Sequence, residues 1–276
     1  MMSAFRNFAL ASTVVLGCLW AAPAQATWQL YVSGGFGYSI AKGKVSGSAQ
    51  APDPGEMFRG KDKDVSPLVG GAFGVEVPMN ELTPWRLPYD LRLPDWPVRF
   101  EFEASGLRDY ELKTDGLFAG GPESDPFRTD INGWSFMQNL WFDVPLRGLF
   151  RPISATSGFL FGKPRLPRLR RFLGPLTTYV GVGIGFAHLK IKTEEPGFRG
   201  KKSKFDFAYQ FGTGLAYQLT DAVNLGLGYR YHKPAKMKLG LADPADRPGT
   251  SKSSEDIHEI RFEIRIRVFD LPYPWR

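Results

Sequence analysis

The segment IHEIRFEIRIRVF, residues 257 to 269, alternates between apolar and charged side chains. Its even positions from Ile260 to Val268 are apolar, and its odd positions from Glu259 to Arg267 carry charges of both signs. A period of two indicates a β-strand whose two faces meet different surroundings. Either the charged face meets water on a soluble protein, or it lines a barrel whose apolar face meets lipid. The rest of the sequence must decide between them.

The first 26 residues predict a cleavable export signal. Arg6 precedes an apolar run of secretory length, and the run ends at Ala24-Gln25-Ala26. The mature chain is therefore expected to begin near Thr27. An alternative is lipid attachment at Cys18, which Val15-Leu16-Gly17 precede. If the signal is removed, the single cysteine leaves with it, so neither a disulfide nor a thiolate site is expected.

Composition favours an exported all-β chain. No other stretch approaches the roughly 18 apolar residues that a membrane-spanning helix needs, so a membrane role would require a barrel. The 31 glycines and 14% aromatic residues fit this class. We expect one domain over residues 27–276, with a C-terminal extension at 270–276. Eight alternating segments are predicted as strands: 28–40, 68–77, 98–106, 133–144, 178–189, 205–219, 223–231 and 257–269.

The second face of each strand distinguishes the two folds. That face carries glycine, serine, alanine or a charged residue, whereas a soluble barrel must fill its interior with branched apolar side chains. A narrow membrane barrel needs small residues and mutually paired charges inside. We therefore predict a lumen ion-pair network and keep a soluble sandwich as the alternative. The predicted network comprises Glu76, Arg99, Glu101, Glu103, Arg230, Glu259, Arg261, Glu263, Arg265 and Arg267.

Four segments, 135–145, 178–192, 207–231 and 258–269, resemble the OmpA-like and opacity-type outer-membrane proteins of Gram-negative bacteria. The resemblance implies an outer-membrane location, periplasmic termini, and a role in adhesion, envelope integrity or host contact. Three features depart from that pattern. Residues 78–97 and 145–176 are long where the family has short periplasmic turns, and DLPYPWR follows Phe269. No peptidoglycan-binding domain is expected after the barrel.

The predicted fold is an all-β, eight-stranded antiparallel up-and-down transmembrane β-barrel with long loops and two enlarged periplasmic turns. Residues 41–67, 107–127, 190–204 and 232–256 are expected to be the surface loops. Near the outer end of the fifth strand, cationic side chains could bind lipopolysaccharide phosphates or simply anchor the barrel at the membrane interface. The residues of this predicted contact are Lys190, Lys192, Lys201 and Lys202.

The two long periplasmic segments suggest a docking surface for a periplasmic or envelope partner. Residues 145–176 contain a basic patch without acidic residues, which could instead lie on the inner leaflet as an amphipathic helix or stay a solvated loop. Its cations are Arg147, Arg151, Lys163, Arg165, Arg168, Arg170 and Arg171. Aromatic residues among prolines are expected to form a cap under the barrel: Trp85, Tyr89, Trp96, Tyr273 and Trp275.

The chain is not expected to be an enzyme. A lipid A-modifying activity would need a nucleophile, a base and an orienting group, and the three histidines, His188, His232 and His258, lack a motif that enforces such geometry. A small outer-membrane pore is the other alternative. No cofactor, metal or nucleic-acid partner is expected, and the predicted surroundings are outer-membrane lipid and lipopolysaccharide.

Overall fold

The computed structural model describes residues 28–49, 55–81, 94, 96–114, 127–146, 174–195, 198–235, 237–242 and 248–271. The predicted export signal at 1–26 lies outside these residues, as do positions 272–276 of the C-terminal extension. Within the described part of the chain, no helix is both long and apolar enough to cross a membrane.

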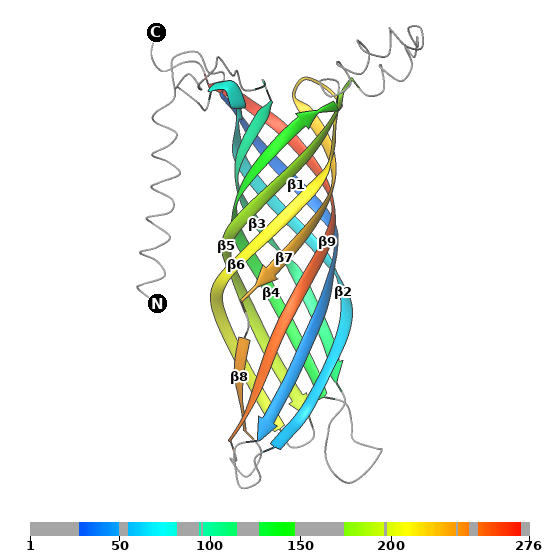
Figure 1. Cartoon of the computed structure of the whole chain (residues 1–276), viewed down its shortest axis with the longest axis vertical. Helices are drawn as coiled ribbons and strands as arrows, with labels where there is room; N and C mark the ends of the chain where they lie inside the picture. The colour runs from blue at the N-terminus through cyan, green and yellow to red at the C-terminus, as the bar shows by residue number, and fades with distance from the viewer. Residues whose placement is uncertain are drawn as a thin grey trace, which may run out of the picture.

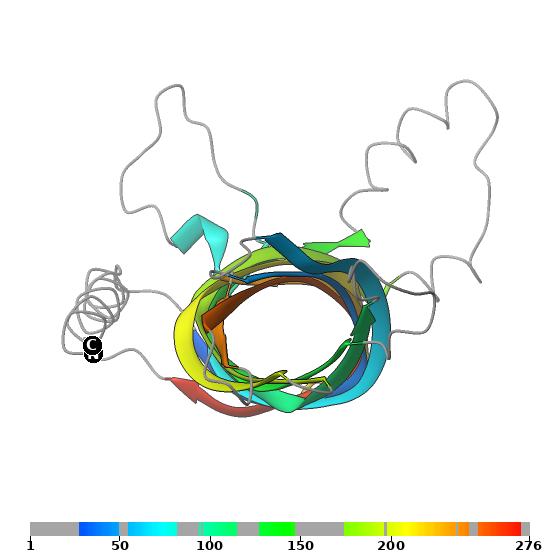
Figure 2. The same cartoon turned by 90° about the horizontal axis from the view of Figure 1, so that it is seen from below.

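Long antiparallel strands form a closed barrel (Figure 1). From β1 to β7 each strand pairs with the next in sequence, and β7 and β8 both pair with β9. β1 pairs with β9 to complete the ring, which has an oval outline in end view (Figure 2). β7 and β8 occupy successive parts of one position, so the wall has eight strands, as predicted. The elements are β1 (Trp28–Ala49), β2 (Gly55–Pro78), η1 (Met79–Glu81), β3 (Pro97–Thr114), β4 (Phe127–Pro145), β5 (Leu176–Glu195), β6 (Phe198–Gln218), β7 (Val223–Pro234), β8 (Met237–Ala242) and β9 (Pro248–Leu271).

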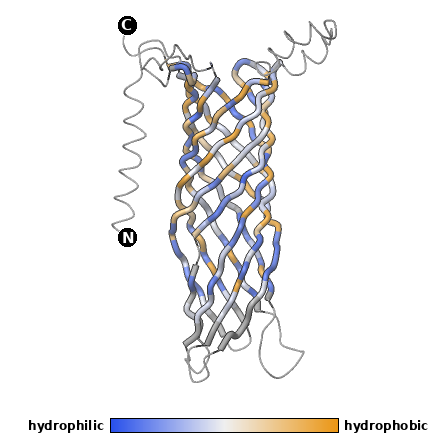
Figure 3. The backbone as a smooth tube through the Cα atoms, in the orientation of Figure 1, coloured by the Kyte–Doolittle hydropathy of each residue, from blue (hydrophilic) through white to orange (hydrophobic). Residues whose placement is uncertain are grey.

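An apolar belt surrounds the half of the barrel that holds the start of β1 and the end of β9. On this belt Phe36 and Phe73 expose 63% and 62% of their surfaces, and Ile260 exposes 49%. Such side chains are tolerated on an outer surface only where lipid replaces water. Figure 3 shows hydrophobic positions along the strands in this half and mainly hydrophilic positions towards the other end. The belt therefore marks the membrane-spanning part.

The four segments predicted as surface loops are mostly strand, so that part of the prediction is wrong. β1 continues to Ala49 and β2 starts at Gly55, while β5 and β6 are separated by only two residues. The strands thus run well past the apolar belt and form a distal extension of the barrel wall. We define this extension as residues 41–49, 55–66, 107–114, 127–133, 187–195, 198–206, 237–242 and 248–259.

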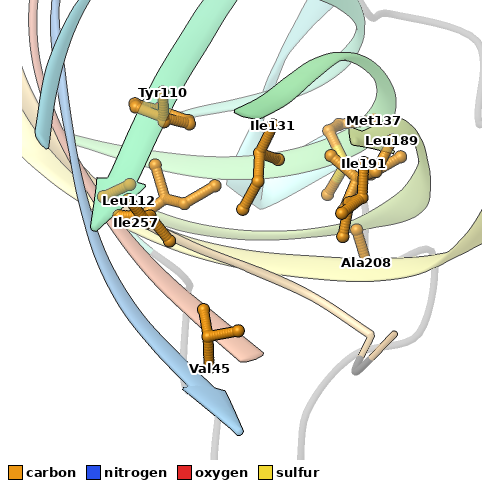
Figure 4. Packing of buried hydrophobic residues seen from close by; sticks show 11 residues of the cluster. Val45, Tyr110, Leu112, Ile131, Met137, Leu189, Ile191, Ala208 and Ile257 are labelled. Atoms are coloured by element: carbon orange, nitrogen blue, oxygen red, sulfur yellow. The ribbon is translucent and has the colours of Figure 1, made fainter. Parts of the chain in front are cut away.

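The distal extension reverses the polarity of the barrel. In β9, Ile260 points outward on the membrane side of the boundary. On the distal side of the boundary, Ile257 is buried inside and Asp256 faces outward. The same change of phase occurs in β5, where Ala187, Leu189 and Ile191 are buried. The expectation that inner faces carry only small or charged residues is therefore wrong for this half. An apolar core fills it (Figure 4), made of Ala41, Val45, Tyr110, Leu112, Ile131, Met137, Ala187, Leu189, Ile191, Ala208 and Ile257.

Two seams divide the wall of the distal extension into two sheets. Backbone pairing between β2 and β3 ends at Val69 and Gly106, next to a bulge in β3. β6 pairs with β7 no further than Ala208, and with β8 only at Arg199. One sheet therefore contains the distal parts of β3, β4, β5 and β6, and the other contains β8 with the distal parts of β9, β1 and β2. The apolar core lies between them.

Two neighbouring acids in β9 should affect stability in opposite directions. Glu255 is buried inside the distal extension, and burial raises the pKa of its carboxyl. Asp256 faces outward, and hydrogen bonds from Lys233 and Tyr231 lower the pKa of its carboxyl. At pH 7, Glu255→Gln should therefore stabilise the extension, because it removes a buried charge, and Asp256→Asn should destabilise it.

The pH dependence provides the control. Glu255 is destabilising above its folded pKa, and this effect disappears below its unfolded pKa of about 4.3. The gain from Glu255→Gln should therefore be lost near pH 4. Most of the loss from Asp256→Asn should remain at pH 4, because the folded pKa of Asp256 lies below its unfolded value of about 3.9. Hydrogen exchange of the distal amides at pH 7 and pH 4 measures both effects. Two variants that change stability in the same direction at pH 7 would contradict this assignment.

Candidate functional site

The membrane-spanning lumen is filled by paired charges. Glu103, which is 4% exposed, accepts hydrogen bonds from the guanidinium groups of both Arg230 and Arg261. Glu259 is fully buried and pairs with Arg261 and with Arg108, at 2.6 Å in each case. The guanidinium of Arg261 thus links the two carboxylates across the lumen. A buried carboxylate left without such a partner would cost several kcal/mol.

A second cluster lies nearer the end of the barrel that holds the chain termini. Arg99 makes an ion pair of 2.9 Å with Asp143, and Arg265 bridges Asp143 and Glu76 at 3.3 and 3.4 Å. Arg99 also lies 3.7 Å from Glu101, whose carboxylate accepts hydrogen bonds from Tyr31, Asn139 and Trp141. Hydrogen bonds therefore supplement the ion pair at the Glu101 carboxylate, whereas Nε of Arg265 is buried without a hydrogen-bond partner among the described residues.

Trp141 fills the space between these charge clusters. Its ring is 1% exposed and lies beneath the guanidinium of Arg230, with 4.8 Å from Cζ to the ring centre. Two inward-facing glycines leave room for it. A Cβ at Gly181 would lie 2.2 Å from the Trp141 ring, and one at Gly212 would lie 2.6 Å from it. The glycine row therefore has a packing role, because it accommodates one large ring in a narrow lumen.

Nine of the ten residues predicted for the lumen network make ion pairs within the barrel. The side chain of Arg267 is half-buried near the terminal rim and makes no ion pair with the described residues. The prediction missed Arg108 and Asp143. The alternation of β4 in the sequence already put Asp143 on the inner face. Arg108 does not follow the alternation of β3, because a bulge before it changes which residues of that strand face inward.

Large buried side chains, among them Trp141 and Arg99, occupy the described part of the lumen. A cavity of about 20 Å³ lies beside Glu103, Arg230, Arg261 and Glu263, which is room for about one water molecule. The apolar core of the distal extension lies on the distal side of this cavity. This packing gives no support to the alternative of an open pore.

Side chains close the seam between β2 and β3. Asp64 accepts a hydrogen bond from the amide of Glu111 across the seam at 2.8 Å and one from its own neighbour Val65 at 2.7 Å. Asp62 does the same for the amides of Lys113 and Lys63. Ser66 accepts from the amide of Asp109. Three side chains therefore satisfy amide groups that a neighbouring strand would otherwise bind.

Outer faces of the two distal sheets carry different charge patterns. On the sheet of β8, β9, β1 and β2, three lysine pairs lie directly opposite each other across neighbouring strands. On the sheet of β3 to β6 one such pair, Lys192 opposite Lys201, is present, and Arg128 makes ion pairs with Glu111 at 2.6 Å and Asp130 at 3.2 Å. We call the first group the lysine face: Lys42 opposite Lys63, Lys44 opposite Lys61, and Lys238 opposite Lys252.

The four lysines of the predicted lipopolysaccharide contact lie together on β5 and β6. Lys192 is opposite Lys201, and Lys190 is opposite Ser203, all with exposed side chains. Lys202 differs, because its ammonium group donates a hydrogen bond of 2.8 Å to the backbone carbonyl of Lys238. Three of the four therefore share one outward surface, and the fourth reaches across the β6–β8 seam.

The three histidines are separated by the barrel wall. His232 is buried inside, whereas His188 and His258 lie on the outer face, on the distal side of the apolar belt. Nε2 of His188 is 2.7 Å from Oγ of Ser203, a distance suited to a base and a nucleophile. However, Nδ1 of His188 is buried without a hydrogen-bond partner among the described residues, so the group that orients a catalytic base is missing there.

Several predicted sites cannot be compared with the structure. All seven cations of the basic patch at 145–176 lie outside the described residues, as do Trp85, Tyr89, Tyr273 and Trp275 of the aromatic cap. Trp96 is described and half-buried, and its carbonyl accepts a hydrogen bond from the amide of Met79 at 2.8 Å. The described residues contain no group of three or more His, Cys, Asp or Glu side chains arranged to hold a metal ion.

Known proteins with similar sequences are outer-membrane or uncharacterised proteins. Residues 174–259 match the model of a family described as surface antigen. An uncharacterised protein of Brucella abortus is 27% identical over 88% of this chain and 85% of its own length. Outer membrane protein PagN of Salmonella typhimurium is 24% identical over 85% of this chain and 86% of its own length.

The outer membrane protein OprG from Pseudomonas aeruginosa matches with a TM-score of 0.49 and 12% identity, covering 88% of this chain and 98% of that one. Together with the barrel itself, the sequence relatives confirm the predicted OmpA-like or opacity-type barrel and its location in a Gram-negative outer membrane. If the termini are periplasmic, as the resemblance implies, the distal extension is extracellular.

The lumen ion pairs should stabilise the barrel far more than the external ones. Glu103→Ala leaves two buried guanidinium groups short of a partner, and we expect a loss of about 3–5 kcal/mol in the free energy of unfolding. The matched control is Glu111→Ala, which breaks exposed ion pairs with Arg128 and Lys113 and should cost less than about 1 kcal/mol. Urea unfolding of the barrel in lipid bilayers measures both. Equal losses would contradict a stabilising lumen network.

Proposed function

We propose that this outer-membrane barrel is a non-enzymatic attachment protein whose lysine face binds polyanionic polymers at a cell surface. The observation that carries the proposal is the arrangement of three opposed lysine pairs on one sheet of the extracellular extension. Like charges directly opposite each other destabilise a sheet, so fold stability does not account for them. A ligand with closely spaced negative charges would relieve that repulsion.

The geometry of the wall suits an extended ligand. Along β1, Lys42 and Lys44 are two residues apart, which separates their Cα atoms by about 7 Å. The facing lysines of β2 lie about 5 Å away across the strand pair. The resulting grid of cations is held by backbone hydrogen bonds on both sides of β1. A polyanion can therefore bind without first ordering a loop, which lowers the entropy cost of binding.

Acidic groups near the lysine face are already engaged. Asp256 is opposite Lys42, but it accepts hydrogen bonds from Lys233 and Tyr231. The ion pairs among the described residues do not include any of the six lysines of the lysine face.

Removal of two facing lysines tests this function. We expect Lys44→Gln with Lys61→Gln to weaken binding of the barrel to immobilised heparin about tenfold or more, since each lysine near an anionic surface contributes about 1 kcal/mol. The effect should shrink at high salt. The matched control removes two cations from the ion-paired sheet, Lys113→Gln with Arg128→Gln, and should change binding little. Equal weakening by both double variants would rule out the lysine face as the site.

Lipopolysaccharide is a second anionic ligand that the extracellular extension could contact. Three lysines lie just beyond His188 at the outer edge of the apolar belt, which is the level of headgroup phosphates. They are Lys190, Lys192 and Lys201. This proposal concerns a different sheet from the lysine face. The Lys44 and Lys61 variant should therefore leave lipopolysaccharide contact unchanged.

A periplasmic partner remains a separate proposal, supported by the sequence of residues 145–176 alone. We expect a photo-crosslinking probe at Leu169 to give one discrete protein adduct in intact cells. The same probe at Leu219, an exposed residue in the short turn between β6 and β7, provides the control. Lipid adducts, or the same adducts at both positions, would instead indicate that the segment lies on the inner leaflet.

A further inference from the structure

An acidic side chain lies beside the lysine face, where β7, β9 and β1 are neighbours in the wall (Figure 1). Asp256 of β9 is directly opposite Lys42 of β1, and Lys42 is directly opposite Lys63 of β2. All three side chains face outward in the distal extension. They are the next outward residues after the apolar belt ends at Ile40 and Val65. The wall therefore presents charges of both signs at the outer edge of the membrane.

One carboxylate oxygen of Asp256 is available to a ligand. The hydroxyl of Tyr231 donates a hydrogen bond to Oδ1 at 2.7 Å, and the ammonium group of Lys233 donates to the same oxygen. No hydrogen bond with the described residues ends on Oδ2, and the side chain is 35% exposed. Hydrogen bonds from Lys233 and Tyr231 lower the pKa of Asp256, so its carboxylate is charged at neutral pH. Oδ2 can therefore bind a cation from solution.

Aromatic rings lie next to this carboxylate. Tyr231, whose hydroxyl binds Asp256, is half-buried, and its ring centre lies 5.5 Å from that of His258. Nδ1 of His258 is 2.7 Å from the hydroxyl of Tyr229, which holds the imidazole in place. An aromatic face attracts a cation, and alkylated ammonium groups are often bound in this way. A carboxylate with rings beside it therefore favours an organic ammonium group over a metal ion, which needs several oxygen ligands.

The lysines on the other side of Asp256 have no counter-ion among the described residues. Lys42 and Lys63 are exposed, and the ion pairs of the described residues include neither of them. Asp256 does not neutralise Lys42, because its hydrogen bonds go to β7. The two lysines come from strands about 5 Å apart, a spacing at which both ammonium groups can reach one phosphate.

A purely anionic ligand does not account for both halves of this arrangement. It would bind Lys42 and Lys63, but it would be repelled by Asp256. A ligand that carries both charges satisfies both halves. Because β9 and β1 are also about 5 Å apart, a two-carbon link between a phosphate and an ammonium group is long enough to reach from one half to the other.

We propose that these residues bind zwitterionic phosphate esters, in which a short link joins the phosphate to an ammonium group, as in phosphocholine. Lys42 and Lys63 bind the phosphate, and Asp256 with Tyr231 binds the ammonium group. Lipid headgroups of the surrounding bilayer and phosphocholine groups on a facing surface share this chemistry. The site goes beyond the proposed function, because it requires a cation on the ligand as well as an anion.

Retention on beads tests the proposal. The barrel is placed in nanodiscs of phosphatidylglycerol, which has no ammonium group. One set of beads carries phosphocholine, and the matched set carries the same phosphodiester with a neutral dimethylbutyl group in place of choline. We expect Asp256→Asn to lower the ratio of retention on the two sets about fivefold, which corresponds to about 1 kcal/mol. The matched control, Asp109→Asn, removes an equal exposed charge from β3. An unchanged ratio in Asp256→Asn, or equal changes in both variants, would overturn the proposal.

A pair of uncharged substitutions tests the aromatic half. Tyr231→Leu removes the ring and should lower the same ratio, whereas Tyr231→Phe keeps the ring and should retain most of it. If both substitutions have the same effect, the ring does not bind the ammonium group. Circular dichroism checks that each variant folds, and Tyr231→Leu keeps the site testable if Asp256→Asn does not fold.

The source of the ligand and the proposed function are separated by two further comparisons. Nanodiscs of phosphatidylcholine should lower retention on phosphocholine beads if bilayer headgroups reach the site, and unchanged retention assigns the site to a facing surface. Asp256→Asn should not weaken binding to heparin, because it removes a negative charge. The Lys44 and Lys61 variant should lose heparin binding and keep the phosphocholine ratio, since Lys42 and Lys63 remain. Loss of both activities in both variants would mean that no separate zwitterion site exists.

Discussion

Pairing of charges inside the lumen is the constraint on which the rest of this barrel depends. Glu103 and Glu259 come from different strands, β3 and β9, and Arg261 binds both. Together with Arg108, Arg261 ties β3 to β9 across the inside of the barrel. Because a buried charge without a partner is costly, these contacts favour one register of the ring over any slipped register, in which the inner and outer faces would exchange. The closed wall then supports everything beyond the membrane.

Beyond the outer edge of the membrane, the outer face of the same strands meets water instead of lipid. Lipid no longer covers the wall, so the outside becomes polar and the inside becomes apolar. In β9 the change occurs between Ile260, which points to lipid, and Ile257, which is buried in the distal core. These two isoleucines are three positions apart, an odd step, so the apolar phase of the strand inverts without any break in the backbone. The extension is thereby stabilised as a soluble sheet sandwich would be.

This inversion explains which parts of the structure the sequence predicts. Within the membrane, the alternation of β9 and β5 identifies the barrel, the outward residues and most of the ion-paired ones. Past Ile40 the apolar phase of β1 shifts to Ala41 and Val45, and between them lie only glycine and lysine. Such a segment has the composition of a loop, and a change of phase resembles a strand end. Both signals led to the prediction of loops where the structure has strands.

The seams lie beyond the reach of a single-sequence argument, because they depend on which strands meet. The sequence does not distinguish Asp62 and Asp64 from other polar residues. Their role appears only in the fold, where β3 places the amides of Lys113 and Glu111 opposite them. Arg108 likewise reads as a loop residue until the bulge in β3 turns it towards Glu259. Pro234 is the exception, since a proline in an alternating segment already predicts an interruption of pairing.

The division between lumen and outer wall also separates stability from recognition. The lumen pairs and the apolar core are buried, so each contributes strongly and tolerates little change. Lysine pairs on the outer face reduce stability, and the wall can accommodate them because the buried layers hold its strands in place. Features that weaken a sheet are thus concentrated on the extracellular surface, where a bound partner would compensate for them. That distribution is the physical argument for recognition outside the membrane rather than transport through it.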